Sequence, residues 1–123
     1  MIGYTTVGTN DLEKAVAFYD ELLALVGASR FMEEGSFVAW AVTPGKPAFS
    51  VTKPADGNAA SVGNGVMIAL SADSTDLVDT VYAKAIELGG SDEGPPGQRG
   101  DGFYAAYFRD LDGNKLNIFY TDG

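Results

Sequence analysis

The chain has 123 residues, of which 46% are hydrophobic, and this length suits a single domain, residues 1–123, with a core of its own. Its 17 acidic and 8 basic side chains leave a net charge of −9, which makes nucleic acid and anionic membrane surfaces poor partners. The absence of histidine and cysteine excludes imidazole and thiolate metal ligands, a histidine general base and disulfides.

The first half of the chain, residues 1–53, predicts one helix among four strands. Residues 2–7 form the first strand, and residues 11–23 carry apolar side chains at helical spacing. Thr9 or Asn10 is placed to cap this helix, because either side chain can accept a hydrogen bond from a free backbone N–H. Three more strands are predicted at residues 28–32, 36–42 and 47–53. A polar, glycine-rich linker follows at about 54–64.

The second half, residues 65–121, repeats this order. A strand at 66–70 leads into a helix over 73–88, and 94–102 reads as a long loop rich in glycine and proline. Two aromatic-rich runs within 104–119 flank an Asp-Gly pair and predict a β-hairpin. The repeat indicates two duplicated βαβββ modules, neither of which could bury both its helix and its sheet alone.

The turn of this hairpin, residues 108–114, reads Phe-Arg-Asp-Leu-Asp-Gly-Asn. It resembles the last hairpin of the vicinal oxygen chelate superfamily, which comprises glyoxalases, bleomycin resistance proteins and extradiol dioxygenases. In these proteins Phe-x-Asp-Pro-Asp-Gly-Asn precedes a strand that bears a metal-ligating Glu. The resemblance implies an α+β fold in which two βαβββ modules curl their mixed sheets into a cup. It also implies a homodimer that completes each cup across a symmetric interface.

The resemblance also carries an expectation about metal. Many relatives have His near the fourth residue, a second His within Gly-x-His-x-Ala, and the Glu within Asn-x-x-Glu; the matching positions here are Tyr4, Met67 and Asn117. A phenol, a thioether and an amide are poor ligands for the transition metals of this family. We therefore expect a protein without metal or other cofactor. The alternative is a metal site built from other groups, such as Glu33 or Glu34.

Strand alternation gives each sheet one row of side chains for its helix and one for the cup. In the first strand Tyr4 and Thr6 fall in the cup row, and in relatives the face that holds Tyr107 points inward. Trp40 and Phe49 are either an aromatic wall of the cup or ordinary core; Tyr4 and Met67 have the same alternative. Arg99, in the predicted loop, either meets a ligand carboxylate or phosphate or lies in solvent. The expected ligand-binding residues are therefore Tyr4, Thr6, Trp40, Phe49, Met67, Arg99, Tyr107 and Asn117.

Together these features predict a metal-free protein of the glyoxalase or bleomycin resistance type that sequesters or carries a small organic molecule in an aromatic-lined cup. The net negative charge suits a cationic guest, although acidity can equally serve solubility alone. The alternatives are a metal-dependent lyase or dioxygenase with non-standard ligands, or a protein-association module. No catalytic residue is assigned. Neither a leader-like segment nor an apolar run of roughly 18 to 20 residues is present, so we expect a cytoplasmic protein without a membrane partner.

Overall fold

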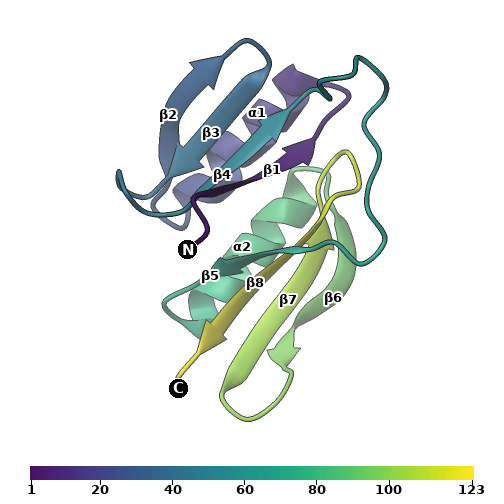
Figure 1. Cartoon of the computed structure of the whole chain (residues 1–123). Helices are drawn as coiled ribbons and strands as arrows, with labels where there is room; N and C mark the ends of the chain where they lie inside the picture. Colours follow the sequence, from purple (N-terminus) through teal and green to yellow (C-terminus); the bar gives the residue numbers. More distant parts are fainter.

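The computed structural model describes all residues, 1–123, and contains two helices and eight strands in two βαβββ units (Figure 1). The first unit consists of β1 (Tyr4–Gly8), α1 (Leu12–Ala24), β2 (Ser29–Glu34), β3 (Phe37–Ala41) and β4 (Ala48–Thr52). The second consists of β5 (Ile68–Ser71), α2 (Thr75–Glu87), β6 (Ser91–Gln98), β7 (Phe103–Arg109) and β8 (Lys115–Thr121). The α+β class and the order of elements predicted from the repeat are confirmed.

Each helix has a buried apolar face and a capping side chain at its first turn. Asp11 caps α1, because its Oδ1 accepts a hydrogen bond from the backbone N–H of Lys14 at 3.1 Å. The prediction that Thr9 or Asn10 caps this helix is wrong. Thr9 Oγ1 instead accepts from the Asp11 N–H at 3.0 Å and so fixes the chain entering the helix. Ser74 caps α2 in the same way as Asp11 caps α1.

The strands form two mixed four-stranded sheets with equivalent order. The first sheet has the order β1-β4-β3-β2 and the second β5-β8-β7-β6, and in each the pair that contains the unit's first strand is parallel. The predicted hairpin joins β7 to β8. Its turn closes through a hydrogen bond from the Asp110 N–H to the Asn114 carbonyl at 2.9 Å, and Gly113 adopts a φ of 91°. Only glycine takes up such a backbone readily, which explains the Asp-Gly pair.

The two units share one core. Eighteen buried apolar residues from both units form a single cluster, and α1 and α2 pack against each other. Polar contacts also cross the boundary: the Tyr19 hydroxyl donates to Asp110 Oδ2 at 2.5 Å, and Asn114 Nδ2 donates to the Gly8 carbonyl at 2.9 Å. Both helices lie behind the sheets in Figure 1. The opposite face of the two sheets is left without a covering layer, and we call it the open face.

A long loop was predicted at 94–102, and this prediction is wrong. β6 continues through Pro95 and Pro96 to Gln98, and only a short turn precedes β7. Proline cannot donate to a ladder, but β6 is an edge strand, and its pairing with β7 is interrupted by two register shifts. Proline and glycine therefore mark an irregular edge strand here rather than a loop.

The strand predicted at 66–70 begins two residues later, at Ile68. Val66, which the predicted strand included, precedes β5 and is 58% exposed. The glycine-rich segment before it forms a turn in which the Val66 N–H donates to the Gly63 carbonyl at 3.2 Å. The linker thus extends to the edge of the second sheet.

Candidate functional site

Strand register identifies the side chains of the open face on the first sheet. Thr6, Ser50, Ala39 and Met32 are successive partners across β1, β4, β3 and β2, so they form one row on one face. The Thr6 hydroxyl lies 2.7 Å from Ser50 Oγ, and Ser50 Oγ in turn donates to the Thr5 carbonyl at 2.7 Å. Because Ser50 uses its only proton on that carbonyl, Thr6 donates to Ser50. Thr6 can therefore offer a ligand only an acceptor.

A hollow of about 480 Å³ lies beside this row, and we call it the apolar hollow. It is lined mainly by apolar side chains, among them Tyr4, Phe31, Met32 and Phe37, with Lys46 as its one charged residue. Tyr4 is 62% exposed, and its ring meets the Phe37 ring edge-on at a centroid distance of 5.9 Å. Tyr4 thus lies on the open face, in the row predicted from strand alternation.

Trp40 and Phe49 do not belong to this face. They are partners across β3 and β4, and Thr5 and Arg30 continue the same row on β1 and β2. This neighbouring row faces α1. Trp40 is 1% and Phe49 6% exposed, and both rings pack against Tyr19 at 5.8 and 4.6 Å. The expected aromatic wall is therefore core. The sequence could not decide this because residues 37–41 are apolar at every position, so alternation does not distinguish the two faces.

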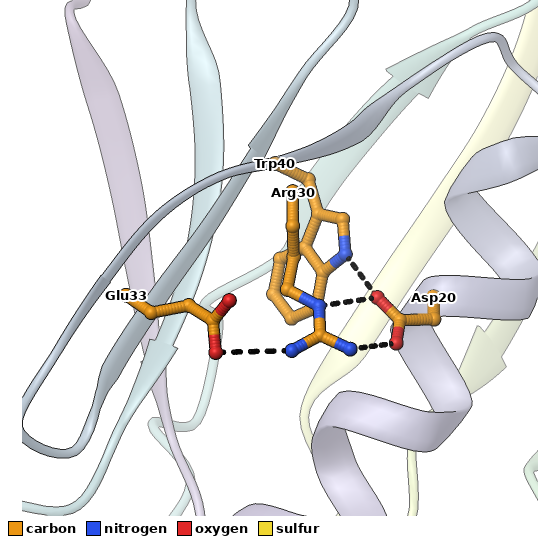
Figure 2. Close-up of polar contacts among 4 residues, drawn as sticks. All are labelled: Asp20, Arg30, Glu33 and Trp40. Atoms are coloured by element: carbon orange, nitrogen blue, oxygen red, sulfur yellow. Dashed lines mark hydrogen bonds and ion pairs between the residues drawn. The ribbon is translucent and has the colours of Figure 1, made fainter.

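A polar cluster fixes Trp40 on the helix side (Figure 2). Trp40 Nε1 donates to Asp20 Oδ1 at 2.9 Å, and the Arg30 guanidinium binds both oxygens of Asp20 at 3.0 and 2.6 Å. A third Arg30 nitrogen meets Glu33 at 3.1 Å. Glu33, suggested as a substitute metal ligand, is therefore engaged by an arginine on the helix side of β2. Glu34 pairs opposite Phe37 at the far end of the strand.

On the second sheet the corresponding open-face row contains Ala69, Asn117, Tyr107 and Gly94. Asn117 is 2% exposed, and its Nδ2 donates to the carbonyl of Ala106 at 3.1 Å. The amide is thus bonded to the backbone of its own sheet. Tyr107 is half-buried beside it, on the face predicted for it.

Two cations lie close to the Tyr107 ring. The Arg99 guanidinium carbon lies 5.7 Å from the ring centroid, and Lys115 Nζ lies 5.5 Å from it. Lys115 also lines a hollow of about 470 Å³, together with Met67, Arg109 and the linker residues 62–66; we call it the basic hollow. Lys115 and Arg109 escaped the sequence analysis, although each lies two residues from a predicted site residue, Asn117 or Tyr107, and so shares its face.

The chain does not bring Tyr4, Met67 and Asn117 into one hollow. Tyr4 lines the apolar hollow, Met67 lines the basic hollow, and Asn117 lines none of the five main hollows. The residue of β1 that shares a crevice with the start of β5 is Val7, not Tyr4. The three positions therefore share no hollow within one chain, and their meeting across a dimer stays a prediction.

Known proteins match this architecture closely. The family model of the glyoxalase/bleomycin resistance protein/dioxygenase superfamily matches residues 1–118. A glyoxalase/bleomycin resistance protein from Albidiferax ferrireducens T118 is 37% identical, with 98% of each chain covered and a TM-score of 0.90. The chain belongs to this superfamily.

More distant structures agree in fold. Hypothetical protein SA1046 from S. aureus is 25% identical over 98% of this chain and 92% of its own, with a TM-score of 0.73. The lactoylglutathione lyase from Agrobacterium tumefaciens, at 22% identity, covers the same shares and has a TM-score of 0.69. No protein of curated function matches the chain. Neither helix has the length and apolarity to cross a bilayer.

The residues at the superfamily's usual ligand positions do not fit a transition metal. The phenol of Tyr4, the thioether of Met67 and the amide of Asn117 bring no negative charge and no imidazole, and Asn117 already donates to its own sheet. No group of three Asp or Glu side chains lies elsewhere in an arrangement that could hold a metal ion. What this superfamily member does offer on its open face is an apolar hollow and a tyrosine whose ring has two cations near it.

Proposed function

We propose that this superfamily member binds a small organic molecule on its open face without a metal ion, and that it sequesters or carries this molecule. The observation that supports the proposal most directly is the apolar hollow, whose volume of about 480 Å³ lies within the range typical of ligand sites. Tyr4 and Phe31 are 62% and 57% exposed there, so aromatic surface is available to a planar guest.

We also propose that two chains associate through this face. Tyr4, Phe31 and Met32 expose large apolar side chains on the same sheet, and β2 is exposed along its whole length. Such a surface favours association, and a symmetric second copy offers the same apolar side chains in return. Each ligand site would then lie between two chains. A cytoplasmic location stays a prediction.

The proposal is tested first by native mass spectrometry of freshly purified protein, which separates bound metal, bound organic ligand and neither. Binding is then measured with N-phenyl-1-naphthylamine, an uncharged aromatic probe whose fluorescence rises in apolar sites. The buried Trp40 is a poor reporter because it lies on the helix side.

A matched pair of variants locates the probe. Met32→Ala, in the apolar hollow, should weaken probe binding several-fold, whereas Leu111→Ala, outside it, should not. The two side chains are equally accessible, at 45% and 43% exposed. Stoichiometric metal in the purified protein, or no probe binding at all, would contradict the proposed function.

A further inference from the structure

Three of the eight arginine and lysine side chains are paired with carboxylates, and the two beside Tyr107 are among the five that are not. Arg30, Lys84 and Arg109 each have a carboxylate oxygen within 4 Å. Arg99 and Lys115 have none, although the chain carries 17 acidic side chains. Two uncompensated cations therefore approach one ring on the open face.

The strand beneath is shaped to receive the Arg99 guanidinium. Its Nη2 donates to the Pro95 carbonyl at 2.5 Å, so the side chain lies back along β6. A Cβ at Gly97 would lie 2.8 Å from Nη1, and one at Gly94 would lie 3.2 Å from the Tyr107 ring. Glycine at both positions therefore leaves the space that the guanidinium occupies beside Tyr107.

The adjoining basic hollow has the same character. Two of its eight lining residues, Lys115 and Arg109, are cationic, and none is acidic. Arg109 is partly compensated, since its Nε meets Glu93 at 2.6 Å, but Lys115 Nζ makes no hydrogen bond or ion pair. A hollow of about 470 Å³ bounded by positive charge is therefore open beside Tyr107.

Arg99 and Lys115 lie 5.7 and 5.5 Å from the same ring centroid, so an anion at the edge of the Tyr107 ring is attracted by both charges. The planar guanidinium also matches a carboxylate or phosphate, which can accept two of its N–H bonds. We propose that the ligand of the open face carries a carboxylate or phosphate group, which binds at Arg99 and Lys115 beside Tyr107, while its apolar part rests in the apolar hollow that a second copy brings against this sheet in the proposed dimer. This inference rests on the proposed function and supplies the chemical class of the ligand.

The net charge of −9 favours a cationic guest, but it acts over longer distances than the contacts of Arg99 and Lys115 with a bound group. Charges farther away than roughly 8 to 10 Å are largely screened at physiological salt, so the nearest side chains decide the bound pose. The overall negative field then slows the approach of an anion without determining its contacts.

A matched pair of probes tests the charge preference. 8-Anilinonaphthalene-1-sulfonate carries one negative charge on the scaffold of N-phenyl-1-naphthylamine. We expect the anionic probe to bind roughly three- to tenfold more tightly than the neutral probe. Arg99→Gln with Lys115→Gln should abolish this preference, so that the two probes bind equally well. Lys14→Gln, which removes an exposed unpaired cation on α1, is the control for single charge loss and should change nothing.

Competition then separates the two acid groups. Benzoate or phenyl phosphate should displace the anionic probe from the parent but not from the double variant, and benzyl alcohol should not displace it. Equal binding of both probes to the parent would overturn the anion inference and leave the proposed function standing. An anion preference that survives in the double variant would overturn it too. Failure of both probes to bind would instead overturn the proposed function.

Discussion

At the scale of single residues, the Tyr19 hydroxyl connects the two units through Asp110. The tyrosine is fully buried, and Asp110 Oδ1 also accepts from the backbone N–H groups of Asp112 and Asn114, each at 2.9 Å. Asn114 Nδ2 adds a bond to Oδ2 at 3.0 Å. The hairpin turn that carries the superfamily resemblance therefore also supplies a buried carboxylate that holds α1 against the second sheet.

Tyr19→Phe should lower the free energy of unfolding by about 1–3 kcal/mol, because Asp110 loses one of its donors while remaining buried. Tyr82→Phe is the matched control: it removes an exposed hydroxyl that donates to Asp92 at 2.8 Å, and its effect should stay within about 0.5 kcal/mol. Urea unfolding measures both. Equal losses in the two variants would show that the cross-unit bond adds nothing.

The same residue predicts a dependence on alkaline pH. Burial, reinforced by the neighbouring Asp110 carboxylate, raises the pKa of Tyr19 well above its ordinary value of 10.0. Because the folded pKa lies above the unfolded one, the stabilisation is complete below about pH 10 and is lost as pH rises toward the folded value. The stability difference between the parent and Tyr19→Phe should therefore shrink above pH 10. A constant difference up to alkaline unfolding would contradict this reasoning.

At the scale of elements, the helices and most strands could be predicted because their patterns are periodic and bounded by caps or glycines. Three features could not. The five residues of β3 are all apolar, so only the pairing of β3 with β4 shows which face of the sheet Trp40 lies on. In β6, Pro95 and Pro96 conceal an edge strand. Cap position depends on one backbone conformation, which places Asp11 rather than Asn10 at the cap.

Some features of the candidate site could likewise be predicted from the sequence, and others could not. Tyr4, Thr6 and Tyr107 lie on the open face because alternation in regular strands fixes their side, and Lys115 follows from the same rule. The meeting of Tyr4 with Met67 and Asn117 stays a prediction, because it depends on how sheets and chains are placed, about which alternation within a strand says nothing.

The glycines of β6 give a prediction for this element. Gly97→Ala places a Cβ 2.8 Å from Arg99 Nη1, and the flexible guanidinium must move away from Tyr107. Gly97 has no positive φ, so the backbone accepts alanine and the melting temperature should change little. The preference for the anionic probe should fall. Gly123→Ala, where nothing lies within 4 Å of the new Cβ, should leave it intact. An unchanged preference in Gly97→Ala would show that the pose of Arg99 does not matter.

At the scale of the whole molecule, the exposed apolar surface of the first sheet predicts a homodimer. Light scattering should give about twice the chain mass of 12.9 kDa at micromolar concentration. Phe31→Glu, on that sheet, should shift the protein toward the monomer by burying a charge in the interface. Leu111→Glu, at an exposed position of the hairpin turn, should not. A parent protein that scatters as a monomer would contradict the association proposal.

Pairing of two chains also gives a role to the three positions that one chain keeps apart. If the first sheet of one copy faces the second sheet of the other, Tyr4 can approach the partner's Met67 and Asn117. The combined variant Tyr4→His, Met67→His and Asn117→Glu would then assemble two imidazoles and a carboxylate across the interface, a set that holds Zn²⁺ or Ni²⁺. Metal should raise its melting temperature by mass action.

The arrangement across two chains is tested by removing the dimer. Adding Phe31→Glu to the triple variant should abolish the rise in melting temperature with metal. A second experiment mixes two chains, one carrying Tyr4→His and the other carrying Met67→His and Asn117→Glu. The mixture should show part of the metal response of the triple variant, because each chain supplies the ligands that the other lacks. Imperfect support around the new ligands can weaken binding by roughly 10- to 100-fold, so metal is added up to millimolar concentration. A full response in a monomeric triple variant would place the site within one chain. No response in a dimeric triple variant would mean that the two sheets do not face each other, and the shared site would have to be abandoned.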